Sequence, residues 1–182
     1  MAEWTHMDAQ GRARMVDVGS KEVTARQAVA CGSVYMQAAT LCAIVEQQVA
    51  KGDVLQVARI AGIMGAKQTP TLIPMCHPLE ITNVEVDLWP DPEGPRVYIE
   101  ARVRNTGRTG VEMEALTAVT VAGLTVYDMC KSLDRQMRLS DVELLYKSGG
   151  KSGEYIHPEY QTQPSPPLSL RERVLARGEG SS

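Results

Sequence analysis

The chain has 182 residues, enough for one well-cored domain of about 100 to 150 residues with tails, but not for two full domains. Its net charge of −3 and the lack of a Lys- or Arg-rich run exclude a general nucleic-acid-binding protein, while a local basic pocket for a small anion stays compatible with them. Phenylalanine is absent, so the core must be built from aliphatic residues and methionine.

The four cysteines are Cys31, Cys42, Cys76 and Cys130. They lie far apart without a C-x-x-C pair, which excludes an iron–sulfur cluster and favours buried free thiols in a reducing compartment. The N-terminus has no apolar signal region, and no segment reaches the length of a membrane span. We therefore expect a cytoplasmic protein that does not bind a membrane.

The N-terminal part predicts a flexible segment followed by strands. Residues 1–13 are polar, and residues 15–18 form a short possible strand. Over residues 23–36 small and apolar side chains fall on one side of a period-two pattern, which favours a strand buried on one face. An alanine-rich helix is the alternative interpretation of the same residues.

Two helices are expected next. Leu41, Ile44, Val45 and Val49 have helical spacing, and Lys51-Gly52 would end that helix. Asp53 is a candidate N-cap for a second helix over residues 54–67, which Lys67 closes, with Pro70 beyond its end.

Three prolines in the following segment, at positions 70, 74 and 78, predict an extended and rigid path rather than a helix. This path carries His77 between Cys76 and Pro78. A fixed imidazole suits proton transfer near neutral pH, although most single histidines have no catalytic role.

The rest of the chain completes an α+β domain. Residues 83–89 and 96–104 alternate as two strands of a hairpin, residues 110–131 form a long helix, and residues 141–147 supply a last strand. This order matches the ferredoxin-like β-α-β-β-α-β plan, an antiparallel sheet with helices packed on one face. We expect one catalytic domain over residues 14–156 and a disordered, proline-rich tail over residues 157–182. The uncovered sheet face is one reason to expect an oligomer.

The long helix gives a second reason to expect an oligomer. Its circumference is almost entirely apolar or small, so it must be buried on more than one side. Glu114 and Asp128 share a face, yet the helical rise separates them by about 21 Å. No small substrate touches both in one chain, so a site that uses both must combine two chains. A buried core helix with exposed charged ends is the alternative.

Several charged groups suit the handling of a phosphate. Asp128 and Lys131 stand three residues apart on the helix and can form an ion pair, or the carboxylate can hold the lysine as an acid or a phosphate ligand. A plain surface salt bridge is the alternative. The segment KSGGKSG over residues 147–153 offers two lysines and glycines that let backbone N–H groups approach an anion, or is simply a surface loop. A metal site has no support, because no ligand spacing is present.

Six segments closely resemble the family of cyclic pyranopterin monophosphate synthases, and the match covers about residues 5–155. They are MVDV (15–18), KGD (51–53), ARIAGIMGAK (58–67), LIPMCHPL (72–79), TGVEMEALTAVTVAGLTVYDMCK (109–131) and KSGGKSG (147–153). The resemblance implies a ferredoxin-like homohexamer, a trimer of dimers with sites at the dimer interface. It also implies a lyase of molybdenum cofactor biosynthesis that acts after a radical SAM GTP cyclase. Such a lyase converts the cyclised dihydro-GTP intermediate to cyclic pyranopterin monophosphate with release of pyrophosphate.

The resemblance also implies the site residues. Asp128 and Lys131 match the catalytic pair, helped by His77 and Lys51. Substrate-contacting and basic positions match Met75, Cys76, His77, Glu112, Met113, Glu114, Arg26, Lys67 and Lys147. No resident metal or cofactor is expected, although Mg²⁺ can accompany the triphosphate.

Two departures from the family pattern are Gln68, where a basic residue is usual, and Gly65, where alanine is usual. Two alternatives also stay open on the sequence alone. One is a nucleotide sensor that binds without turnover, and the other is a purely structural subunit of a larger complex.

Overall fold

A computed structural model describes residues 10–12, 15–91 and 94–160 of the chain. The expectations for residues 1–9 and 13 and for the tail from residue 161 onward lie outside the described residues. The elements are β1 (Thr24–Tyr35), α1 (Ala38–Val45), α2 (Val54–Leu72), β2 (Ile81–Pro90), β3 (Arg96–Gly107), α3 (Glu112–Cys130), β4 (Arg138–Ser148), β5 (Tyr155–Ile156) and a 3₁₀ turn (Pro158–Tyr160).

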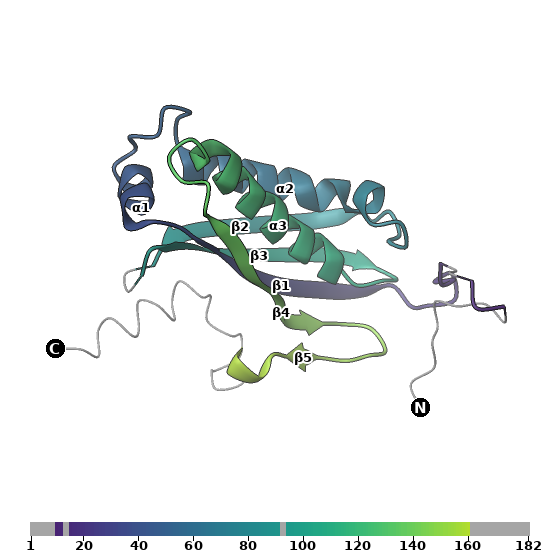
Figure 1. Ribbon diagram of the computed structural model, residues 1–182. Coiled ribbons are helices and arrows are strands. Elements are labelled where there is room, and N and C mark those ends of the chain that lie inside the picture. The colour runs from purple at the N-terminus through teal and green to yellow at the C-terminus, as the bar shows by residue number, and fades with distance from the viewer. Residues whose placement is uncertain (1–9, 13–14, 92–93, 161–182) are drawn as a thin grey trace.

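The strands form one antiparallel sheet in the order β2-β3-β1-β4-β5, with α2 and α3 side by side on one face (Figure 1). The predicted α+β, ferredoxin-like arrangement is therefore confirmed. It is extended by the additional helix α1 and the short strand β5. No helix in the described part of the chain combines the length and the apolar character that crossing a membrane requires.

The central strand β1 resolves the ambiguity of residues 23–36 in favour of a strand. It pairs with β3 on one side and β4 on the other, and residues 28–34 are buried. Gly32 lies directly under α3, since a Cβ at this position would lie 2.6 Å from Cγ1 of Val119. The small residues of β1 are therefore explained by the close approach of a helix to the sheet.

Small residues also let α2 and α3 pack closely together. A Cβ on Gly62 would lie 2.9 Å from the carbonyl oxygen of Ala118. A Cβ on Gly65 would lie 2.8 Å from a methyl group of Val121. The departure at Gly65 thus coincides with a tight helix–helix contact, in which an alanine would require Val121 to shift.

The structure corrects the predicted course of the chain before α2. Residues 15–18 do not form the expected strand, because they pair with no other strand in the described part of the chain. Met15 is exposed. Helix α1 begins earlier than expected and ends at Val45, because Gln47 adopts a left-handed backbone with φ 55°. Val49 is buried but lies beyond the helix.

The expected end of α2 at Lys67 is also wrong, because the helix continues through Pro70 to Leu72. A proline lacks the N–H for one helical hydrogen bond, but Pro70 lies in the last turn, where the helix is about to end. The amide of Ile73 still donates to the carbonyl of Thr69, 2.9 Å away, and closes that turn. The predicted N-cap is confirmed, since the carboxylate of Asp53 accepts from the amide of Gln56 at 3.1 Å.

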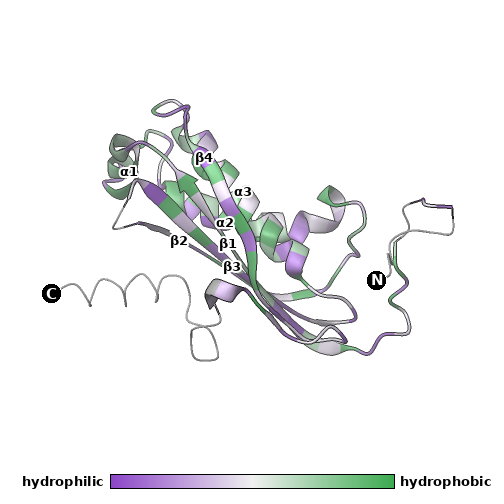
Figure 2. Ribbon diagram, turned by 60° about the horizontal axis from the view of Figure 1, so that its bottom comes forward, coloured by the Kyte–Doolittle hydropathy of each residue, from purple (hydrophilic) through white to green (hydrophobic). Residues whose placement is uncertain are grey.

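The sheet face opposite the helices is not a bare apolar surface. Val29, Cys31 and Leu145 form a small cluster that Tyr160, only 1% exposed, covers. Next to it, the guanidinium of Arg102 contacts the buried Glu100 at 3.4 Å. Figure 2 shows hydrophilic and hydrophobic residues mixed along the strands. Residues 157–160, expected to belong to the tail, therefore pack on the domain, and this face gives little reason for oligomerisation.

All four cysteines are free thiols, but the expectation that they are buried holds for only two of them. Cys31 and Cys130 are buried, Cys76 is half-buried and Cys42 is exposed. Burial, together with the nearby charges of Glu143 and Glu100, raises the pKa of Cys31 to about 12. Its thiol therefore stays protonated and inert at neutral pH.

Candidate functional site

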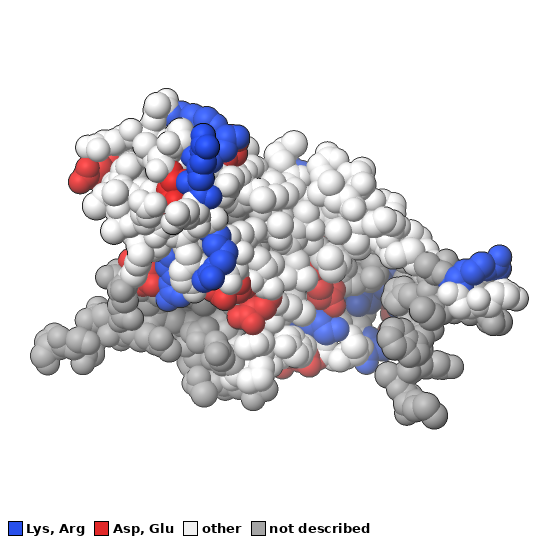
Figure 3. All heavy atoms as spheres, viewed as in Figure 1, with Lys and Arg blue, Asp and Glu red and all other residues white. Residues whose placement is uncertain are grey.

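The C-terminal end of α3 carries a carboxylate between two lysines. Asp128 accepts from Nζ of Lys131 at 2.6 Å and from Nζ of Lys51 at 2.9 Å. Lys51 also donates to the backbone carbonyl of Asp128 at 2.8 Å. Basic side chains gather over this end of the helical layer in Figure 3. This group, which we call the lysine clamp (Lys51, Asp128 and Lys131), is exposed and open to a ligand.

The lysine clamp depends on the antiparallel packing of α2 and α3. Lys51 comes from the loop that leads into the Asp53 cap, so the start of α2 lies beside the end of α3. The two lysines, Lys131 first and Lys51 second, lower the pKa of Asp128 to about 2. Asp128 in turn raises the pKa of Lys131. Asp128 is therefore ionised at neutral pH, and because two basic side chains surround one carboxylate, the lysine clamp attracts an anion.

The N-terminal end of α3 presents the opposite situation. Glu114 is only 2% exposed, and burial raises its pKa to about 7, with a further rise from the charge of Glu112 and an opposing backbone hydrogen bond. Glu112 itself is half-exposed and forms an ion pair with Lys147 of β4 at 3.3 Å. The carboxyl group of Glu114 can therefore gain or lose a proton near neutral pH.

The segment after α2 reaches this same end of α3. Met75, Cys76 and His77 are half-buried, and burial followed by the charge of Glu114 raises the pKa of Cys76. Cys76 therefore lies near Glu114. The imidazole of His77 makes no hydrogen bond or ion pair within the described parts of the chain.

The predicted basic residues are not all gathered at one place. Arg26 lies on β1, where its Nε donates to the carbonyl of Gly107 at 2.9 Å. Lys67 lies on the exposed side of α2 and makes no ion pair with the residues that the structure describes. Gln68 next to it is also exposed and accepts a bond from Thr71.

The structure therefore divides the predicted site residues into two groups within one chain. Lys51, Asp128 and Lys131 lie at one end of α3, and Glu112, Glu114 and the segment over residues 75–77 lie at the other. Because α3 is continuous from Glu112 to Cys130, the helical rise separates Glu114 from Asp128 by about 21 Å. One chain does not bring the two groups together.

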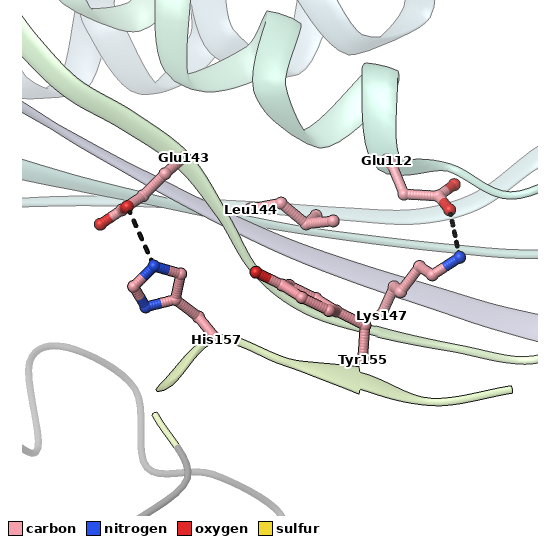
Figure 4. Close-up of a pocket in the computed structure, with 6 residues that line it drawn as sticks. All are labelled: Glu112, Glu143, Leu144, Lys147, Tyr155 and His157. Atoms are coloured by element: carbon pink, nitrogen blue, oxygen red, sulfur yellow. Dashed lines mark ion pairs between the residues drawn. The ribbon is translucent and has the colours of Figure 1, made fainter. Parts of the chain in front are cut away.

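Two hollows at the N-terminal end of α3 include residues that the sequence analysis missed. One, of about 460 Å³, lies among Glu112, Lys147, Tyr155, His157 and Glu143, with the ion pairs Glu112–Lys147 and His157–Glu143 on its two sides (Figure 4). The other, of about 750 Å³, lies between residues 20–27, 108–112 and 148–152. Of these lining residues, the sequence analysis named Glu112, Arg26 and the KSGGKSG segment, whereas the others come from distant segments that share no local pattern.

No group of three or more metal-ligating side chains occurs in the part of the chain that the structure describes.

Comparisons with known proteins agree with the resemblance. The MoaC family matches residues 15–150. A protein named "Cyclic pyranopterin monophosphate synthase" from Pelotomaculum thermopropionicum is 61% identical over 155 residues, covering 85% of this chain and 91% of that protein. Proteins of the same name from Rhodospirillum rubrum and Desulforapulum autotrophicum are 63% and 58% identical, covering 83% and 88% of this chain and 91% and 98% of those proteins. The chain therefore belongs to the MoaC family.

Proposed function

We propose that the chain is a cyclic pyranopterin monophosphate synthase of molybdenum cofactor biosynthesis. It is a lyase that converts 3',8-cyclo-7,8-dihydro-GTP to cyclic pyranopterin monophosphate and releases pyrophosphate. The observation that carries the proposal is the lysine clamp, an anion-attracting group preformed in a chain that shares about 60% identity with proteins of that name.

In this proposal the two groups of site residues perform different parts of the reaction, in keeping with their surroundings. Closing the cyclic phosphate forms a P–O bond to the α-phosphorus and breaks the bond to the β-phosphate, so negative charge grows on the departing pyrophosphate. Lys51 and Lys131, each paired with Asp128, stabilise the charge on the pyrophosphate. Glu114 exchanges a proton near neutral pH, and His77 in the segment beside it is the second group that transfers protons in this proposal.

A complete site requires two chains in this proposal, which is why we also propose a homohexamer built as a trimer of dimers. The two residue groups on α3 lie about 21 Å apart in one chain, beyond the reach of one small substrate. The helical layer also exposes apolar side chains that an interface would bury. They are Val57, Ile60 and Met64 of α2 and Leu124 of α3.

The same proposal includes the source of the substrate, the role of Mg²⁺ and the cellular compartment. The substrate is the product of a radical SAM GTP cyclase, and Mg²⁺ enters with the triphosphate rather than as a resident ion. The enzyme works in the cytoplasm, where its four thiols stay reduced.

The decisive experiment measures pyrophosphate release from the cyclised dihydro-GTP. The expected result is that wild type releases pyrophosphate, whereas Lys131→Ala folds and binds the intermediate but releases none. A wild-type protein that binds the intermediate without turnover would make it a nucleotide sensor instead. Turnover by the isolated protein excludes a purely structural subunit.

A further inference from the structure

The turn that follows α3 is fixed by a buried carboxylate. Asp134 is only 2% exposed, whereas Lys131 and Arg135 in the same turn are exposed. One carboxylate oxygen of Asp134 accepts from the amide of Gln136 at 2.9 Å, and the other accepts from the amide of Gln37 at 2.8 Å. A buried carboxylate needs such donors in place of water, so these two bonds hold both backbone segments against Asp134.

The bond to Gln37 joins two segments that lie 97 positions apart in the sequence. Gln37 is the residue immediately before α1, and its own side chain makes no capping hydrogen bond to that helix. Asp134 therefore holds the start of α1 from outside the helix, in the way that the acidic residue of a capping box bonds the N-cap amide. Figure 1 shows α1 at the end of the molecule where α3 ends and β4 begins.

Both lysines of the lysine clamp belong to segments that Asp134 connects. Lys131 directly follows α3, and the amide of Asp134 donates to the carbonyl of Cys130 at 3.1 Å. Lys51 follows α1 through residues 46–50, which form neither helix nor strand. Because this connection has no secondary structure of its own, the position of α1 decides whether Nζ of Lys51 reaches Asp128.

The buried thiol of Cys130 gives a second sign that Asp134 lies near the lysine clamp. Burial raises the pKa of Cys130, the charge of Lys51 opposes that rise, and the carboxylate of Asp134 adds to it. Cys130 is the last residue of α3. Both groups therefore lie near the end of this helix, Asp134 in the interior and Lys51 at the surface.

We propose that Asp134 is a positioning residue for the lysine clamp. It holds the start of α1 against the turn after α3, so that Lys51 approaches Asp128 from a neighbouring segment while Lys131 approaches it along the helix. Asp134 is buried and does not touch the substrate itself. This inference rests on the proposed function for the reaction that the clamp serves, but the arrangement of the lysines can be measured without that reaction.

The test breaks the link from each of its two sides in the full-length, assembled protein. Asp134→Ala removes both acceptor oxygens. Gln37→Pro removes only the amide donor of Gln37, at a position whose φ of −73° suits proline, and it remains informative if Asp134→Ala fails to fold. Glu100→Ala is the matched control, because Glu100 is also a buried carboxylate, 6% exposed, but lies on the sheet face opposite the helices.

Competitive acetylation with acetic anhydride, followed by mass spectrometry of the peptides, reports the reactivity of each lysine. Both variants should raise the reactivity of Lys51 about two- to fivefold relative to Lys67, because Lys51 loses its ion pair with Asp128. Lys131 should keep its wild-type reactivity, because the helix alone places it beside Asp128.

Kinetics with the cyclised intermediate give the second readout. In both variants kcat should fall on the order of tenfold to a hundredfold, because a displaced cation no longer stabilises the departing pyrophosphate. The KM should stay within about twofold of wild type, since that charge develops only in the transition state. Glu100→Ala should change neither kcat nor the reactivity of Lys51.

The outcomes separate this inference from the proposed function. Unchanged reactivity of Lys51 in Gln37→Pro that still unfolds cooperatively overturns the inference. An equal rise in Glu100→Ala, or an equal rise at Lys51, Lys131 and Lys67, also overturns it, because either result reports general loosening of the fold. A selective rise at Lys51 with unchanged kcat overturns the catalytic part. If wild type does not turn over the intermediate, the proposed function fails, and the lysine reactivities still decide whether Asp134 positions the clamp.

Discussion

The two ends of α3 carry carboxyl groups in opposite electrostatic states. At the C-terminal end, Asp128 is exposed and lies between two lysines, which lower its pKa to about 2. At the N-terminal end, Glu114 is buried, and its pKa is raised to about 7. One helix therefore presents a fixed charge at one end and a group that titrates near neutral pH at the other.

The contrast shows that neighbours and burial, rather than residue type, decide what each carboxyl group does. Charge partners keep Asp128 ionised, while the loss of water around Glu114 favours its neutral form. A reaction that needs both a bound anion and proton transfer requires the groups at both ends of α3. The predictions below test that division, beginning with the largest expected effect.

Removing the charge at the exposed end should cost the most activity. Asp128→Asn leaves Lys51 and Lys131 without the carboxylate that orients them, so turnover should fall about 10²- to 10⁴-fold. Stability should change little, because the group is exposed. Pyrophosphate release and thermal unfolding measure the two effects. Asp87→Asn, which removes an exposed carboxylate paired with Arg59, is the control and should retain activity.

Mixing variants tests whether the two ends act in one site. Glu114→Gln and Asp128→Asn should each be inactive alone. In a two-fold dimer, each site would combine Glu114 of one chain with Asp128 of its partner. Every mixed dimer then contains one site in which both residues are intact. Unfolding and refolding the two variants together should then restore about a quarter of wild-type turnover. No recovery in oligomers shown to be mixed would contradict a shared site.

The buried end should make stability depend on pH. The folded pKa of Glu114, about 7, is above its unfolded value, so the neutral form stabilises the fold. That stabilisation is fully present below the unfolded pKa and is lost as the pH rises through about 7. The loss should amount to on the order of 3 kcal/mol.

Chemical unfolding between pH 4 and 9 measures this dependence. Glu114→Gln, which cannot ionise, should flatten the decline above about pH 5. An identical pH dependence in wild type and variant would show that Glu114 is hydrated or paired in the folded protein.

The smallest expected effect concerns the loop after β4, whose glycines lie against Arg26 near the N-terminal end of α3. Gly150→Ala and Gly153→Ala both place an alanine at positive φ and should each cost about 1 kcal/mol of stability. Only the first also displaces the guanidinium of Arg26, because open space surrounds Gly153. Steady-state kinetics should therefore show a raised KM for the cyclised intermediate in Gly150→Ala alone. Equal KM values in the two variants would mean that the glycine does not position Arg26.

Local sequence determined most of the elements of this protein. Period-two alternation marked the hairpin of β2 and β3, and the N-cap at Asp53 marked the start of α2, because both signals act over a few neighbouring residues. The apolar circumference of α3 correctly indicated burial against both a sheet and a helix. The ion pair of Asp128 with Lys131 also followed from helical spacing alone.

Only the tertiary structure decided where those elements meet. It added Lys51 to the pair on α3, buried Glu114 and carried α2 past Pro70. It also gathered cations from three distant segments around the hollow of about 750 Å³. Burial and through-space charge depend on residues that are far apart along the chain, so no local pattern reports them. The sequence by itself determined which residues and elements are present, and packing decided which of them share a site.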